Sequence, residues 1–162
     1  MDLNERQTAE LWHRSYTAVD GLWFMKVEEK YGFEAALDID DEVWKVLPKI
    51  QARMLKASGE IPPGIDGLLD CLTKRLSLEG AAFEPEKAAD GSGFKIRISR
   101  CPWHDIMVSS GRAELSEKVG SRICTTEYSA WAAEFGDSIR FELGEHICGG
   151  ASSCILNFSS AH

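Results

Sequence analysis

The chain has 162 residues, of which 44% are hydrophobic and 27% are charged, and its formal net charge is −8. This length fits one domain, residues 1–162, with a core of its own. The acidic balance argues against nucleic-acid binding and against docking on anionic membranes, since both need a basic surface. The N-terminus lacks the basic start and apolar run of a signal peptide, and no apolar stretch reaches the roughly 20 residues of a membrane helix. We therefore expect a cytoplasmic protein with reduced thiols, with no nucleic-acid or membrane partner, and we leave homo-oligomer formation open.

The N-terminal part, residues 1–60, reads as a helical subdomain. Apolar residues at helical spacing predict a helix over 5–30 that ends at Gly32. A second helix is expected from Asp40 as N-cap to Gly59, with a kink at Pro48. Aromatic side chains crowd these helices, and at this spacing we expect them in the core: Trp12, Tyr16, Trp23, Phe24, Tyr31 and Trp44.

Residues 61–162 form the predicted cysteine-rich portion. After the break at Pro62–Pro63, a third helix carries an apolar stripe, with Cys71 at its edge as a buried structural residue. The pattern then changes to period two and predicts strands over 82–86, 94–98, 139–143 and 154–158. Between the second and third strands we expect two short helices, 112–119 and 125–135, that end at Gly120 and Gly136. The resulting β-β-α-α-β-β order indicates an α+β fold, with helices covering one face of a small antiparallel sheet.

Four of the five cysteines lie in the last 62 residues, and they are the residues that suggest chemistry. Cys101 and His104 form a Cys-x-x-His pair, Cys124 precedes an expected helix start, and Cys148 and Cys154 flank a glycine-bearing turn. Thiolate and imidazole donors are the ligands of zinc and, for thiolates, of iron–sulfur clusters. We predict that these five residues converge at one end of the sheet as metal ligands, with zinc or an iron–sulfur cluster as the cofactor. A bland alternative is that the cysteines are small buried residues of a packed sheet.

The same residues allow a second chemistry. Arg100 and His104 lie near Cys101 in the chain and could lower its pKa, which would make it a nucleophile. Arg100, Trp103 and Arg112 are candidate binding residues for a small-molecule ligand, since arginine holds carboxylates in bidentate geometry.

The tail of the chain resembles a known family. The run Ile139-Arg-Phe-Glu-Leu-Gly-Glu145, followed by Cys148-Gly-Gly-Ala-Ser-Ser-Cys154-Ile-Leu-Asn-Phe158, is similar to the closing motif of 4-vinyl reductase domains. The wider cysteine set and the tryptophan-bearing N-terminal helices, such as the segment 21–29, are similar to small proteins grouped with L-2-amino-thiazoline-4-carboxylic acid hydrolase. The first resemblance implies an α+β domain that binds a small molecule or metal through Cys148 and Cys154. The second implies hydrolysis of a C–N bond in a sulfur-containing or cyclic amino acid.

Three functional hypotheses follow from these patterns. The leading one is a metal-binding protein of 4-vinyl reductase-like type that acts as a small-molecule binder, sensor or accessory protein. The second is a hydrolase in which Cys101 or a metal-bound water attacks and His104 carries the proton. The third is a structural or interaction module with buried cysteines.

Overall fold

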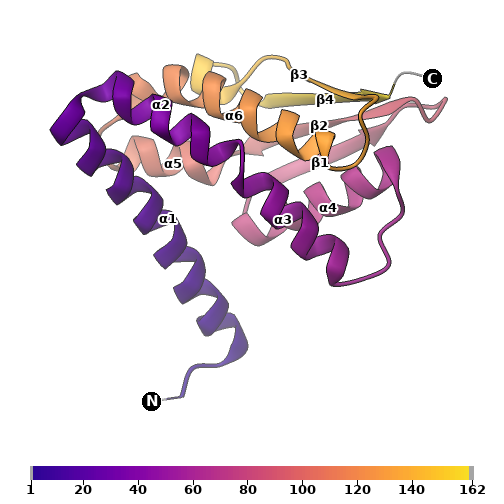
Figure 1. The fold of residues 1–162 in the computed structure, drawn as a ribbon, viewed down its shortest axis with the longest axis horizontal. Helices are drawn as coiled ribbons and strands as arrows, with labels where there is room; N and C mark the ends of the chain where they lie inside the picture. The colour runs from indigo at the N-terminus through magenta and orange to yellow at the C-terminus, as the bar shows by residue number, and fades with distance from the viewer. Residues whose placement is uncertain (1, 161–162) are drawn as a thin grey trace. The chain divides into compact units, whose positions relative to one another are not determined.

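A computed structural model describes residues 2–160, which form six α-helices, two 3₁₀ turns and a four-stranded sheet (Figure 1). No helix within this part of the chain is long and apolar enough to cross a membrane. In chain order the elements are α1 (Glu5–Tyr31), α2 (Phe33–Trp44), α3 (Leu47–Ala57), α4 (Gly64–Glu79), β1 (Ala82–Lys87), β2 (Gly93–Arg100), α5 (Pro102–Ser109), η1 (Ala113–Leu115), α6 (Ser116–Ala133), β3 (Ile139–Leu143), η2 (Ile147–Gly149) and β4 (Cys154–Ser160).

The chain separates into two compact units, the first ending at Glu42 and the second beginning at Val43. The division lies within α2, so α3 belongs to the larger unit together with the sheet. The sequence pattern had suggested a boundary between subdomains at Pro62–Pro63.

Helix α1 dominates the first unit, and its ends are set by local sequence. The Asn4 side chain accepts a hydrogen bond from the Gln7 N–H, and the Gln7 side chain accepts one from the Asn4 N–H. Gly32, with φ 88°, ends the helix in a conformation that favours glycine. The helix runs unbroken through Gly21, and Phe24 packs edge-to-face on Phe33.

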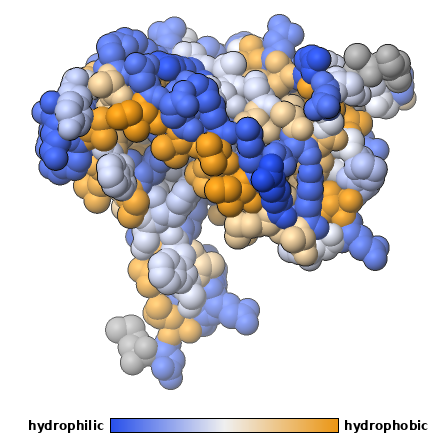
Figure 2. Space-filling view, viewed as in Figure 1, coloured by the Kyte–Doolittle hydropathy of each residue, from blue (hydrophilic) through white to orange (hydrophobic). Residues whose placement is uncertain are grey.

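The predicted core role of the N-terminal aromatics is wrong for most of them. No described residue of α1 is buried, and Trp12 and Trp23 expose 70% and 68% of their surface. Figure 2 shows hydrophobic residues, coloured orange, on the surface of α1. Only Trp44, at the end of α2, is a core residue in the sense expected. Apolar residues at helical spacing mark a face that avoids water, and the pattern does not say whether that face meets the chain's own core.

The single kinked helix predicted from Asp40 to Gly59 is also wrong. Asp40 lies inside α2, and Pro48 occupies the first turn of the separate helix α3. Proline has no N–H to donate and a fixed φ, so it fits a helix start better than a helix interior.

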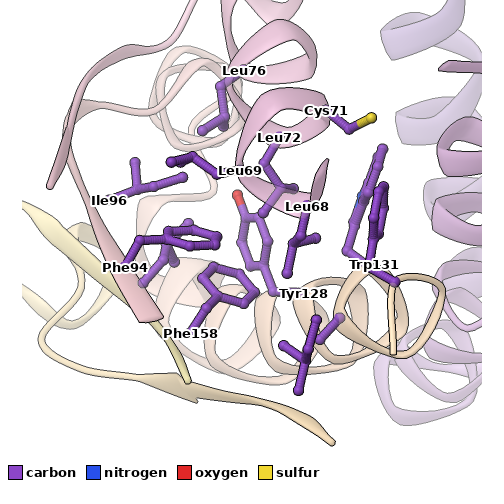
Figure 3. Packing of buried hydrophobic residues seen from close by; sticks show 14 of the residues in the cluster. Leu68, Leu69, Cys71, Leu72, Leu76, Phe94, Ile96, Tyr128, Trp131 and Phe158 are labelled. Atoms are coloured by element: carbon purple, nitrogen blue, oxygen red, sulfur yellow. The ribbon is translucent and has the colours of Figure 1, made fainter. Parts of the chain in front are cut away.

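The sheet is antiparallel with strand order β1-β2-β4-β3, which confirms the predicted α+β class and the β-β-α-α-β-β order. Alternation places one face of β2 and β4 inward, where Ile96 is paired with Leu156 and Phe94 with Phe158. Helices α4 and α6 cover this face (Figures 1 and 3). Cys71 of α4 is fully buried among these side chains, as expected.

The helical segment between β2 and β3 differs from the prediction. Helix α5 starts at Pro102, where no helix was expected, because proline fits the first turn of a helix. Helix α6 passes through Gly120 without a break. Cys124 therefore lies inside a helix and not in front of one.

Asp20 is a half-buried carboxyl group on α1, and burial raises its pKa to about 6 from the ordinary 3.8. The folded chain holds this proton more tightly than the unfolded chain, so ionisation lowers stability as the pH rises from about 4 to 6. Asp20→Asn should raise the free energy of unfolding at pH 7 by about 1–2 kcal/mol, discounted for partial exposure, and should have little effect at pH 4. Urea unfolding followed by circular dichroism at both pH values measures this. An equal effect at the two pH values would show that ionisation is not the cause.

Candidate functional site

The register of the sheet brings three cysteine-bearing segments to one end. Ile98 of β2 is paired with Cys154, the first residue of β4, and Cys101 follows directly after β2. Strand β3 ends at Leu143, paired with Leu156, so the connection over 144–153 leaves from the same end. Antiparallel pairing therefore places Cys101, Cys154 and the loop that carries Cys148 together.

The loop over 144–153 is held by backbone and side-chain contacts. The N–H of Ile147 donates to the Sγ of Cys154 at 3.3 Å. The His146 carbonyl accepts hydrogen bonds from Gly149 and Ala151, and the His146 ring lies against the Cα of Gly149, where a Cβ would come within 3.0 Å of its Nε2. Gly149 is thus required by the close approach of the His146 ring.

Gly120 provides the contact between this loop and helix α6. A Cβ at Gly120 would lie 2.7 Å from the Sγ and 2.9 Å from the Cβ of Cys148. The glycine that sequence patterning assigned to a helix end therefore lets η2 approach the helix and fixes the position of Cys148. Cys124 lies four residues later, one turn along the same face of α6.

His104 lies beside Cys148, since its Nδ1 is 3.6 Å from the Cys148 Sγ. The predicted partnership with Cys101 was based on their adjacency in the chain, but the contact observed for the imidazole is with Cys148. The predicted ligands thus come from the end of β2, from α5, from α6, from η2 and from the start of β4.

The four thiols lie close enough to influence each other's ionisation. Burial raises the pKa of Cys101, Cys124 and Cys154, and it raises the pKa of Cys148 to about 12. The negative charge of a neighbouring thiolate raises the pKa further in three cases: Cys154 acts on Cys101, Cys101 acts on Cys148, and both act on Cys124. The expected low pKa of Cys101 is not found, although a hydrogen bond from the His104 backbone N–H does lower it in part. Arg100 pairs instead with Asp105 at 2.7 Å, and desolvation of the thiolate dominates.

Glu127 is a buried carboxylate next to this cluster that the sequence analysis missed. It pairs with Arg75, which also binds Glu79 at 2.9 Å, and all three side chains are over 90% buried. Its negative charge contributes to the raised pKa of Cys124 and of Cys101. The sequence could have indicated this neighbour, because Cys124 and Glu127 are three residues apart on one helix and residues at that spacing share a face.

All five cysteines are free thiols. Within residues 2–160, no three His, Cys, Asp or Glu side chains are already arranged to hold a metal ion. Of the candidate binding residues, Trp103 packs edge-to-face on Trp44 at 5.7 Å, Arg100 is held by Asp105, and Arg112 lies half-buried before η1. His162 lies outside the described residues.

The comparisons with known proteins give a family. The sequence model of a family described as "Family of unknown function (DUF6125)" matches residues 6–144. The chain belongs to this family. No curated protein matches the chain. The DUF6125 match includes Cys101, His104 and Cys124, and it ends before Cys148 and Cys154.

Gly120→Ala tests the contact between α6 and Cys148. Alanine in a helix interior normally stabilises by roughly 0.5–1 kcal/mol, but here the new methyl group would collide with Cys148, so we expect a net loss of about 1–3 kcal/mol. Gly21→Ala is the matched control, because it also lies inside a helix and a Cβ there meets nothing within 4 Å. Urea unfolding of the reduced protein in EDTA measures both. Equal stabilisation by the two substitutions would contradict the close approach.

Thiol reactivity tests the raised pKa values. At pH 8 in EDTA, the four clustered cysteines should react with a disulfide reagent at least about tenfold more slowly than an unperturbed thiol, because they are largely protonated. Unfolding in urea should bring all five to the ordinary rate. Fast native-state labelling of Cys101, mapped by mass spectrometry, would instead support a nucleophilic role for it.

Proposed function

We propose that Cys101, Cys124, Cys148 and Cys154 bind a metal, either zinc or an iron–sulfur cluster, with His104 as a substitute or additional ligand. The protein would then act in the cytoplasm as a small-molecule binder, sensor or accessory protein of 4-vinyl reductase-like type.

The observation that carries this proposal is that four cysteines from separate elements lie at the same end of the sheet. They come from the end of β2, the middle of α6, the turn η2 and the start of β4, whereas Cys71 lies on α4 and none of the four thiols contributes to its raised pKa. A core needs no such grouping of thiols, since any small apolar residue fills the same space. Soft donors gathered from distant parts of the chain are typical of zinc and iron–sulfur sites.

Electrostatics supports the same proposal. Burial in this poorly solvated site raises the pKa of all four thiols, and for Cys101 and Cys124 repulsion from other thiolates and from the buried Glu127 carboxylate raises it further. A divalent cation or an iron–sulfur cluster supplies the positive charge that permits all of them to ionise. Binding would require deprotonation and rotation of the thiol side chains toward the ion, because three donors are not arranged around a common point in the described residues.

A hydrolase is the second candidate, and the contact between His104 and Cys148 favours it. A cysteine with an imidazole at 3.6 Å has the two partners of an activated nucleophile, so the geometry supports Cys148 in that role in place of Cys101. Two observations oppose it: burial keeps the Cys148 thiol protonated, and the N–H groups of Gly149, Gly150 and Ala151 donate to backbone carbonyls of the same loop. Those N–H groups therefore do not serve as an oxyanion hole in this arrangement.

Metal analysis of anaerobically purified protein, combined with its absorbance spectrum, tests the leading proposal. We expect about one zinc per chain and no colour, or iron and sulfide with visible absorbance. Each of Cys101→Ser, Cys124→Ser, Cys148→Ser and Cys154→Ser should lower the affinity for Co²⁺, read from thiolate-to-cobalt absorbance, by at least about tenfold.

Cys71→Ser is the matched control, since it changes a buried cysteine outside the cluster and should leave Co²⁺ binding unchanged. Absence of metal after anaerobic purification, together with no Co²⁺ binding, would sink the metal proposal. Loss of turnover in Cys148→Ser with metal content unchanged would favour the hydrolase.

A further inference from the structure

Helix α1 carries an apolar seam most of whose large side chains are exposed. Positions spaced alternately four and three residues apart lie along one side of the helix, and they are occupied by Glu5, Ala9, Trp12, Tyr16, Val19, Trp23, Lys26 and Lys30. This is the spacing of a coiled-coil seam. Of its large residues, Trp12, Val19 and Trp23 are exposed and Tyr16 is half-buried, and Leu11 and Leu22 beside them are exposed as well.

The exposed area is sufficient for a stable interface. If the five residues at the centre of the seam and beside it were covered in two copies, about 1,200 Å² would be buried, which is the lower limit for specific protein–protein interfaces. A helix of 27 residues is also longer than most helices in globular domains, and a helix without buried residues gains little from tertiary packing. Both facts indicate that this seam packs against another molecule.

The residues of the seam are complementary to those of a second copy that runs antiparallel to the first. The midpoint between Trp12 and Trp23 falls between residues 17 and 18, and so does the midpoint between Glu5 and Lys30. A two-fold axis at that point places Trp12 of each copy opposite Trp23 of the other, and Glu5 opposite Lys30. The same axis places Ala9 opposite Lys26, where the small side chain leaves room for the lysine stem.

Charge selects the antiparallel orientation. A parallel pair in register would place Glu5 against Glu5 and Lys30 against Lys30, which is repulsive. Neither Glu5 nor Lys30 has an ion-pair partner among residues 2–160, whereas Lys26 is already bound to Glu29 at 2.8 Å. An antiparallel pair satisfies both residues and opposes the two helix dipoles. We propose that two copies of the chain associate through an antiparallel pairing of their α1 helices, centred between residues 17 and 18.

Sedimentation equilibrium of the full chain in reducing buffer with EDTA tests this pairing independently of metal. We expect wild type at twice the chain mass, and Trp12→Ser with Trp23→Ser at the mass of one chain. Glu5→Lys should weaken the dimer by roughly tenfold, because it creates two repulsive pairs, and Glu5→Lys combined with Lys30→Glu should restore the affinity to within about threefold. Circular dichroism shows whether each variant is folded.

Leu78→Ser is the matched control, because Leu78 is an exposed leucine on α4 that lies outside the seam, and it should leave the dimer intact. A monomeric wild type overturns the proposal, as does a dimer unchanged by Trp12→Ser with Trp23→Ser. A dimer lost in the tryptophan variant but unaffected by Glu5→Lys overturns the antiparallel orientation, since a parallel pair exchanges one like-charge contact for another. A monomeric wild type that binds phosphatidylcholine vesicles with a blue shift of tryptophan fluorescence would assign the seam to a lipid surface.

Discussion

The antiparallel register between β2 and β4 is the constraint on which the larger unit depends. It places the inward side chains of both strands against α4 and α6, and it sends the end of β2 and the start of β4 to the same edge. Because β3 pairs with β4 on the other side, its exit lies at that edge too. A slip of one residue would turn Cys154 to the other face of the sheet and separate it from Cys101. The position of the thiols thus follows from the same pairing that forms the core.

Burial then determines the chemical state of the thiols. In water a cysteine at neutral pH is a few per cent ionised, but at this site desolvation and the neighbouring charges favour the neutral form. Neutral thiols are compatible with a core that has only a structural role. They also carry the protons that a metal displaces when it binds. The buried pair of Arg75 and Glu127 lies beside the cluster and brings a negative charge toward it, which an apolar core would not require.

The sequence predicted the parts of the fold that depend on local pattern. The alternation in 94–98, 139–143 and 154–158 identified strands, and the stripe of α4 identified the burial of Cys71. The errors occurred where a residue serves a distant contact. Gly120 was interpreted as a helix end because glycine usually has that role, but it is inside α6 to admit Cys148, which is 28 positions away in the chain. For the candidate site, the pattern identified which residues to consider, and only the fold could show that His104 lies next to Cys148.

The cysteine cluster lies in the larger unit and the apolar seam of α1 in the smaller one, and the two depend on different properties of the chain. The cysteine cluster is formed by long-range pairing within the larger unit, so its geometry is sensitive to changes such as a methyl group at Gly120. The seam of α1 is formed by a single continuous helix, whose spacing follows from the sequence alone once the helix is capped at Asn4 and Gly32. The helical pattern assigned Trp12 and Trp23 to a core, but both are exposed, so the same pattern indicates a surface for association. In a chain with a net charge of −8, two copies approach only if local attraction exceeds general repulsion, and an apolar seam with Glu5 and Lys30 at opposite ends provides that attraction.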